Sequence, residues 1–258
     1  MNKEPTGAGD LRRSLELLWR GPEPGRRGPK QRLSTDEVVE AAIALADAQG
    51  IEALSMRKVA EAVGVSPMSL YTYVPSKTEL LDLMFDRVLG ETPDPNEALP
   101  GWRVKLAFIA RQRWALTERH PWLLDLALHR PPLGPNVMRK AESTMRTFEG
   151  MGLAPEEMGL AAEALQNYVT GALHAAREAR EAERRTGMTD AEWFAIIADE
   201  LGGRIESGGF PVIKRLKEAG GGAKVSATHD AVARFEFGLE RILDGLEAFI
   251  RQRNAPPA

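Results

Sequence analysis

The stretch SMRKVAEAVGVSPMSLYTYVPSK, residues 55–77, predicts two short helices joined by a tight turn. Ser55 is a good N-cap for the first helix, and Gly64 stands where a helix C-terminus favours a residue that tolerates positive φ. Ser66 then caps a second helix that begins at Pro67, where the missing N–H costs nothing. The arrangement is typical of a helix-turn-helix.

The second of these helices turns polar and aromatic groups outward. Leu70 and Val74 lie four residues apart and face inward, so the remaining side chains point away from the core. Hydroxyls can meet base edges or phosphates, and apolar groups can meet thymine methyls, so such a face suits a major groove. The outward residues are Pro67, Met68, Ser69, Tyr71, Thr72 and Tyr73.

Further helices are predicted on both sides of this pair. Residues 34–37 form a capping box ahead of an apolar stripe that stops at Gly50. Residues 76–79 resemble a second capping box and open a connector helix that runs to about residue 91. Residues 33–91 therefore predict three helices and a connector.

This region resembles the DNA-binding domain of the TetR family of one-component regulators, from about Leu33 to Leu89. By that resemblance, Ser66, Tyr71 and Lys77 are expected to touch phosphates, and Arg57 to approach a base or a phosphate. Ser55 is placed with this DNA-binding set, and Pro67, Met68, Ser69, Thr72 and Tyr73 are expected at base edges. Met68 and Val74 replace a frequent glycine and a frequent phenylalanine of the family, so the base preference is not predicted. The resemblance rests on Ala41, Ala42, Leu45, Gly50, Leu54, Ser55, Met56, Arg57, Val59, Ala60, Gly64, Val65, Ser66, Leu70, Tyr71, Tyr73, Val74 and Lys77.

Positive charge is concentrated just before the three helices, although the whole chain carries a formal net charge of -3. Residues 1–32 are interpreted as a flexible basic arm, with a short amphipathic helix predicted over residues 10–20. Arg26, Arg27 and Lys30 are candidates to enter a minor groove, as arginine-bearing arms do. The alternative is a solvated tail that only aids solubility.

Residues 92–258 predict a second, almost entirely helical domain. No convincing strand alternation and no solenoid-length repeat is present. The fold class is therefore all-α: a DNA-binding domain followed by a helical effector-binding and dimerisation domain. Helices are expected at roughly 98–118, 122–128, 135–151, 155–185, 190–206 and 229–252, with a long loop at 207–227 that can hold a short helix at 212–218.

Two long C-terminal helices carry apolar stripes suited to helix–helix packing. A homodimer is expected because a helix-turn-helix reads two half-sites about one DNA turn apart, and the family resemblance implies a seam made of the two longest C-terminal helices. The alternative is that both stripes fill the core of one protomer. The predicted dimer contacts are Leu165, Val169, Phe235, Leu239, Ile242, Leu246 and Phe249.

A small-molecule site is predicted between the helices before residue 155 and the long helix that follows. Large apolar side chains with a few convergent polar groups are what a drug-sized ligand requires. The alternative is that the aromatic side chains belong to the core and that His174 forms a hydrogen bond with a neighbouring carbonyl. The candidates are Trp114, Trp122, Met138, Phe148, Asn167, Thr170 and His174, and they suggest an apolar or aromatic effector.

Several other classes of protein find little support in the sequence. The chain has no cysteine, so disulfides and thiolate chemistry are excluded. No apolar run spans a bilayer, the N-terminus lacks a signal-peptide core, and a cytoplasmic location is expected. The four histidines lack metal-ligand spacing, and no nucleotide or nucleophile motif occurs, so no catalytic residue, metal or cofactor is predicted.

The sequence thus predicts a ligand-responsive regulator that holds double-stranded operator DNA and releases it when a small molecule binds. A repressor is favoured, but an activator of the same fold would share this sequence logic. A helical binding protein whose helix-turn-helix no longer reads DNA, or an enzyme with a helical cavity, would also be all-α.

Overall fold

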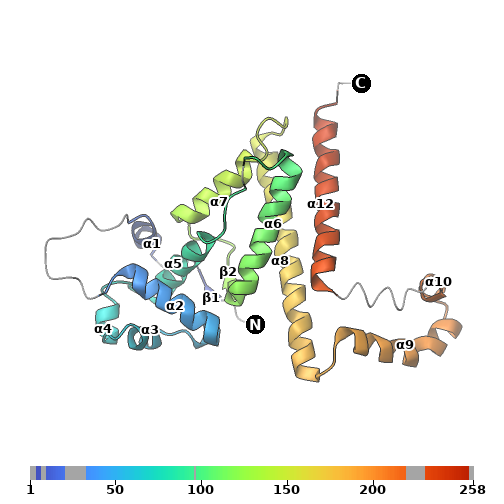
Figure 1. The fold of residues 1–258 in the computed structure, drawn as a ribbon, viewed down its shortest axis with the longest axis horizontal. Helices are drawn as coiled ribbons and strands as arrows, with labels where there is room; N and C mark the ends of the chain where they lie inside the picture. The colour runs from blue at the N-terminus through green and yellow to red at the C-terminus, as the bar shows by residue number, and fades with distance from the viewer. Residues whose placement is uncertain (1–3, 7–9, 21–32, 96, 219–229, 256–258) are drawn as a thin grey trace. The chain divides into compact units, whose positions relative to one another are not determined.

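The computed structural model describes residues 4–6, 10–20, 33–95, 97–218 and 230–255 (Figure 1). The chain divides into two compact units, Met1–Met158 and Gly159–Ala258. Nearly all of the described elements are helices, which confirms the all-α prediction. Arg26, Arg27 and Lys30 of the predicted arm lie outside the described residues.

The first unit contains the predicted helix-turn-helix and the helices that support it. In chain order its elements are β1 (Glu4–Pro5), α1 (Leu11–Leu18), α2 (Thr35–Gln49), η1 (Ile51–Ala53), α3 (Met56–Ala62), α4 (Pro67–Leu70), α5 (Lys77–Leu89), α6 (Gly101–Arg119), η2 (Pro121–Asp125), β2 (Leu126–Ala127) and α7 (Pro135–Arg146). The remaining helices are α8 (Pro155–Thr186), most of which belongs to the second unit, α9 (Asp190–Ser207), α10 (Pro211–Glu218) and α12 (Ala231–Arg253).

Serine caps fix the starts of the DNA-binding helices. Ser34 forms the predicted capping box with Glu37, whose carboxylate accepts from the Ser34 N–H at 2.7 Å. The prediction of a second capping box is wrong. The Ser76 hydroxyl accepts a hydrogen bond from the Thr78 N–H and donates one to the buried Glu79 carboxylate. Glu79 is thus drawn inward and does not reach back to the cap backbone.

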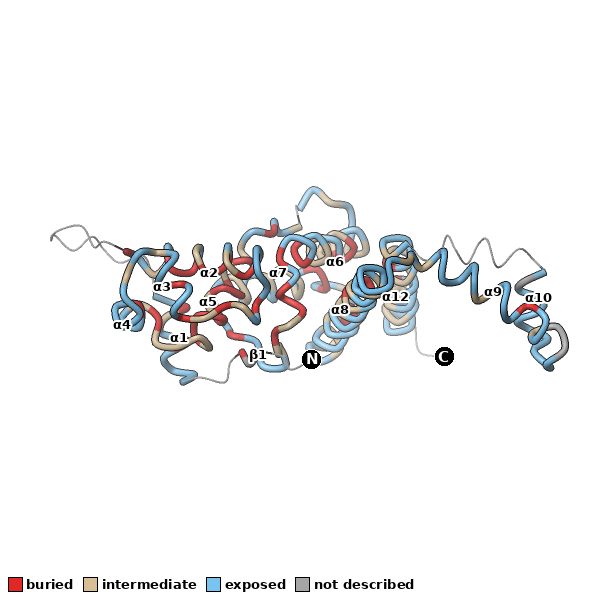
Figure 2. The backbone as a smooth tube through the Cα atoms, turned by 90° about the horizontal axis from the view of Figure 1, so that it is seen from below, coloured by how far each residue is buried: buried red, intermediate tan, exposed pale blue. Residues whose placement is uncertain are grey.

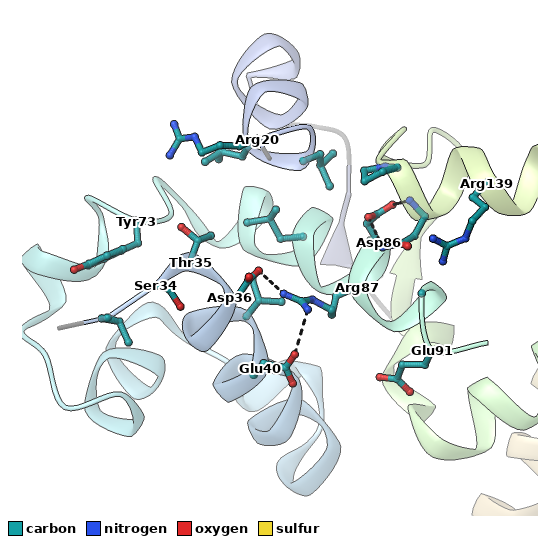
Figure 3. Close-up of a pocket in the computed structure, with 18 of the residues that line it drawn as sticks. Arg20, Ser34, Thr35, Asp36, Glu40, Tyr73, Asp86, Arg87, Glu91 and Arg139 are labelled. Atoms are coloured by element: carbon teal, nitrogen blue, oxygen red, sulfur yellow. Dashed lines mark hydrogen bonds and ion pairs between the residues drawn. The ribbon is translucent and has the colours of Figure 1, made fainter. Parts of the chain in front are cut away.

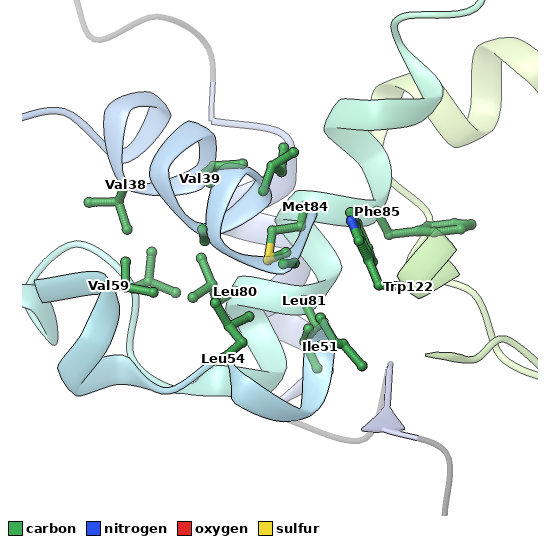
Figure 4. Packing of buried hydrophobic residues seen from close by; sticks show 14 of the residues in the cluster. Val38, Val39, Ile51, Leu54, Val59, Leu80, Leu81, Met84, Phe85 and Trp122 are labelled. Carbon is green, nitrogen blue, oxygen red and sulfur yellow. The ribbon is translucent and has the colours of Figure 1, made fainter. Parts of the chain in front are cut away.

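A single hydrophobic cluster holds α2, α3, α4 and α5 together (Figure 4). Leu70 of α4 and Val74 just after it are fully buried, as their spacing predicted. Trp122, Leu123 and Leu126 from beyond α6 belong to the same cluster. Because burying each large apolar side chain stabilises the fold by about 1.5–3 kcal/mol, this cluster gives α4 a rigid base.

The segment after α6 differs from the prediction. Instead of a helix over residues 122–128, the chain forms the 3-10 turn η2 and then β2, which pairs in parallel with β1. Trp122 donates its indole N–H to Asp47 at 2.7 Å, and the backbone at Leu126 and Ala127 pairs with Glu4 and Pro5. Apolar spacing alone could not reveal these distant partners.

The end of α7 also differs from the prediction, whereas the short helix in the long loop agrees with it. Helix α7 stops at Arg146 instead of residue 151, and Gly150 and Gly152 beyond it adopt positive φ. Helix α10, Pro211–Glu218, confirms the short helix that was predicted at residues 212–218 within the long loop.

In the second unit, α8 and α12 pack closely around one aromatic pair. The ring of Tyr168 stacks on Phe235 with centroids 6.2 Å apart, and its hydroxyl donates to the Phe235 carbonyl at 2.7 Å. A Cβ at Gly238 would collide with the Tyr168 ring. A glycine at this position therefore allows the two helices to approach.

Candidate functional site

The outer face of α4 is an exposed surface set on a buried base. Met68 is 77% exposed and Tyr71 is 43% exposed, whereas Leu70 between them is fully buried. Tyr73 is half-buried and packs against the core, so only part of it faces outward. Ser66, Pro67, Ser69 and Thr72 complete the exposed face.

Hydrogen bonds within this turn hold its hydroxyls in place. The Ser66 hydroxyl accepts from the Ser69 N–H at 3.1 Å and lies 2.9 Å from the Ser69 hydroxyl. Thr72 donates to the Ser69 carbonyl at 2.7 Å. These side chains keep exposed oxygen atoms, so they can still accept hydrogen bonds while their orientation is restrained.

Cationic side chains flank the exposed face but are partly engaged already. Arg57 pairs with Glu61 at 2.9 Å, and both side chains are largely exposed. The Ser55 hydroxyl caps α3, because it accepts a hydrogen bond from the Lys58 N–H. Lys77 is half-buried at the start of α5. An exposed pair such as Arg57–Glu61 is weak and exchanges readily for a phosphate contact.

Asp86 on the connector helix α5 fastens α7. Its carboxylate accepts from the Asn136 N–H at 3.0 Å, from the Asn136 amide at 2.9 Å and from the Val137 N–H at 2.9 Å. Burial raises the pKa of Asp86, and these hydrogen bonds and the charge of Arg139 oppose the rise. These hydrogen bonds join α5 to the first turn of α7. We call a side-chain contact of this kind, which links two helices through polar groups, a tie.

The next residue, Arg87, fastens the other side of α5 to α2. Its guanidinium donates to Asp36 and lies 3.5 Å from Glu40 (Figure 3). Two adjacent residues of α5 thus form polar contacts with two different helices. Any tilt of α5 must strain or break one of these ties.

A third tie surrounds the buried His120 at the end of α6. Its ring nitrogens lie 2.8 Å from an Asp47 oxygen of α2 and 3.1 Å from a Glu91 oxygen that follows α5. The Trp122 indole donates to the same Asp47 oxygen. Sequence reasoning missed this group and the Asp86 and Arg87 ties, because each joins residues at least 29 positions apart.

An open polar groove of about 1290 Å³ lies beside these ties (Figure 3). Residues of α1, α2, α5 and α7 line it, and many are charged. An apolar effector prefers an apolar enclosure, so this groove is a poor match for one. None of the residues predicted to bind the effector lines it.

The structure distributes the predicted effector residues between different environments. Trp122 and Phe148 are buried in the first unit, and the Trp122 indole is already bonded to Asp47, so packing accounts for both. Trp114 is half-buried and Met138 is 44% exposed. On α8, Asn167 is exposed and Thr170 and His174 are half-buried, with helical spacing that puts all three on one face.

The predicted dimer residues also fall into two groups. Leu165, Val169, Phe235 and Leu239 are buried within the single chain, as the alternative interpretation anticipated. The half-exposed residues are Ile242, Leu246 and Phe249 on α12.

The described residues contain no group of three or more His, Cys, Asp or Glu side chains that could hold a metal ion. Among the same residues, no helix is both long enough and apolar enough to cross a bilayer.

An exposed helix-turn-helix face, a connector tied to neighbouring helices and a long-helix C-terminal unit define a DNA-binding regulator. Two family models agree: "Bacterial regulatory proteins, tetR family" matches residues 38–84, and "Tetracyclin repressor-like, C-terminal domain" matches residues 92–250. The chain belongs to the TetR family of DNA-binding transcriptional regulators.

Individual relatives extend over nearly the whole chain. The HTH-type transcriptional repressor DrrR1 of Streptomyces coeruleorubidus is 44% identical over 99% of this chain and 92% of its own length. An HTH-type transcriptional regulator of Saccharopolyspora erythraea is 32% identical over 90% of this chain and 91% of its own. The solved structure of Streptomyces coelicolor ActR in complex with actinorhodin is 32% identical, covers 84% of this chain and 96% of its own, and superposes with a TM-score of 0.68.

Proposed function

We propose that this chain is a homodimeric repressor that binds operator DNA through the exposed face of α4 and releases it when a small apolar or aromatic molecule binds. Its activity is reversible binding without catalysis, in the cytoplasm where the chromosome lies. The observation that carries the proposal is the exposed run around Leu70, held on a fully buried base. A rigid base lets exposed side chains meet base edges without a large ordering cost.

Exposed apolar side chains in the second unit support the homodimer. Helices α9 and α10 and the turn between them expose eight large apolar side chains, and Figure 2 shows both helices as mostly exposed. Patches of this kind are typical of surfaces that become covered by a protein partner. The side chains are Trp193, Phe194, Ile196 and Leu201 of α9, Phe210 just before α10, and Val212, Ile213 and Leu216 of α10.

The ties on α5 support a route by which an effector could change DNA binding. A ligand that displaces α7 pulls on Asp86, and the neighbouring Arg87 passes the movement to α2. The DNA-binding faces of the two protomers would then no longer match the spacing of the half-sites. The ligand drives this change only if it binds the released state more tightly than the DNA-bound state.

The proposal is tested by mobility shift with DNA fragments from around the chain's own gene, in the presence of nonspecific competitor. We expect a specific complex that contains two protomers or a multiple of two. Aromatic compounds, starting with the actinorhodin found bound to ActR, are then screened for release of that complex. A complex that forms equally on unrelated DNA would refute operator reading.

A further inference from the structure

Arg113 is a half-buried cation on α6 that no described residue neutralises. Its Nε is buried and makes no hydrogen bond, and no carboxylate of the described residues lies within ion-pair distance of its guanidinium. Its guanidinium carbon lies 6.0 Å from the centroid of the Phe85 ring on α5. Isolated buried charges are costly, so such a group calls for a partner.

Buried apolar side chains lie close to Arg113. Ala110 and Leu116, which lie one turn away on the same face of α6, are buried, and so is Phe85. Burial lowers the pKa of Arg113 to about 10, and no charged or hydrogen-bonding neighbour opposes this shift. The guanidinium nevertheless stays protonated at neutral pH, so the protein carries an uncompensated positive charge beside an aromatic ring.

Arg113 remains accessible to a small molecule. The residue as a whole is half-buried, and of its three guanidinium nitrogens only Nε is fully buried without a hydrogen bond. Phe85 lies against the guanidinium through a cation–π contact, while the planar N–H groups suit two parallel bonds to a carboxylate. An aromatic acid could stack in this apolar setting and place its carboxylate against the N–H groups of the guanidinium.

We infer that Arg113 is the anion-recognising residue for the effector and that the effector is an aromatic organic acid. The inference rests on the proposed effector-responsive function and specifies the chemical class of its ligand. It also gives the ligand a direct route to DNA binding, because Phe85 precedes Asp86 and Arg87 on the connector helix.

The experiment compares binding of 2-naphthoate and 2-naphthamide, which share a ring system and differ in charge, by isothermal titration calorimetry. We expect the wild-type protein to bind the acid at least about tenfold more tightly than the amide, since a guanidinium forms stronger, charge-assisted hydrogen bonds with a carboxylate than with a neutral amide. Arg113→Met should abolish this preference and leave amide binding unchanged. Arg111→Met, at an exposed position of the same helix, should leave the preference intact.

Thermal unfolding separates a recognition role from a structural one. Removing an uncompensated half-buried charge should leave the melting temperature of Arg113→Met equal to or above that of the wild type. A melting temperature several degrees lower would show that Arg113 supports the fold and would overturn the inference.

The remaining outcomes are equally decisive. Equal affinity for acid and amide, or a preference that survives in Arg113→Met, would refute anion recognition but leave an uncharged effector possible. If neither compound binds, an aromatic acid is not the ligand and the inference fails. Specific operator binding measured without any compound reports separately on the proposed function.

Discussion

At the scale of single residues, exposure on α4 could be predicted, but engagement with neighbours could not. The inward Leu70 and Val74 follow from spacing, and the outward Met68 and Tyr71 follow from them. That Tyr73 lies partly against the core depends on the side chains around it. Local periodicity gives the face of a residue and leaves its tertiary contacts open.

Tyr71→Phe tests the proposed phosphate contact at the smallest scale. It removes one hydroxyl from an exposed side chain and keeps the ring, so the fold should be unaffected. A hydrogen bond to a charged phosphate is worth about 1.5–3 kcal/mol, so operator affinity should fall about tenfold or more. Fluorescence anisotropy at fixed salt measures the change. The loss should be similar on altered operators, since phosphates carry no sequence information.

Asp86 should make stability depend on pH. Its pKa is raised in the folded state, so its contribution to stability is complete below the unfolded pKa and is lost as pH rises through the folded pKa. The free energy of unfolding of the wild type relative to Asp86→Asn should therefore decline from about pH 4 upward. Urea titrations at several pH values measure it, with the exposed Asp199→Asn as control. A relative stability that rises over this range would contradict the assignment.

Residues that carry the ties between helices were invisible in the sequence. Asp47, Asp86 and Arg87 look like ordinary charges on amphipathic helices, and Arg113 looks like one more surface arginine. Their roles depend on partners brought together by the fold. A half-buried unpaired cation in particular becomes evident only when its surroundings are known.

At the scale of elements, caps and breakers were the reliable signals. The starts of α2, α3, α4 and α5 follow serine caps, as predicted. The segment at residues 122–128 was predicted wrongly, because its apolar residues fit a short helix as well as a buried turn. Its pairing with β1 depends on residues more than a hundred positions earlier.

Replacing either of two glycines by alanine should lower the stability of the fold, for a different reason in each case. Gly64 has φ +70° and open space around it, so Gly64→Ala should cost about 1 kcal/mol of backbone strain. Gly134 has ordinary φ, but a Cβ there would collide with Asp86 and Leu18, so Gly134→Ala should cost about 1–3 kcal/mol through overpacking. Chemical denaturation measures both. An unchanged Gly134→Ala would mean that the junction of α5 and α7 is looser than described.

At the scale of the whole molecule, the basic arm should set the salt dependence of binding. Replacing Arg26, Arg27 and Lys30 by alanine removes three positive charges ahead of α2 and keeps β1 and α1, so fewer counterions are released on DNA binding. Operator affinity should fall, and its dependence on salt should flatten. An unchanged slope in a salt series would show that the arm is only a solvated tail.

Dimerisation should depend on the half-exposed face of α12. Leu246→Glu places a charge at this face, so the protein should become monomeric and its operator affinity should fall by about a hundredfold or more, because one half-site contact is lost. Sedimentation velocity and anisotropy report the two effects, with the exposed Gln252→Glu as control. A variant that remains dimeric would place the seam elsewhere.

The most direct test of the central claim is an anisotropy titration of an operator from the chain's own locus against a scrambled duplex. The wild type is compared with Tyr71→Ala/Lys77→Ala and with Arg241→Ala on α12, an exposed arginine far from α4 in sequence. We predict that the wild type and Arg241→Ala bind the operator far more tightly than the scrambled duplex, and that the double variant loses this preference while remaining folded. Equal binding of the double variant and the wild type would contradict the assignment of the reading face.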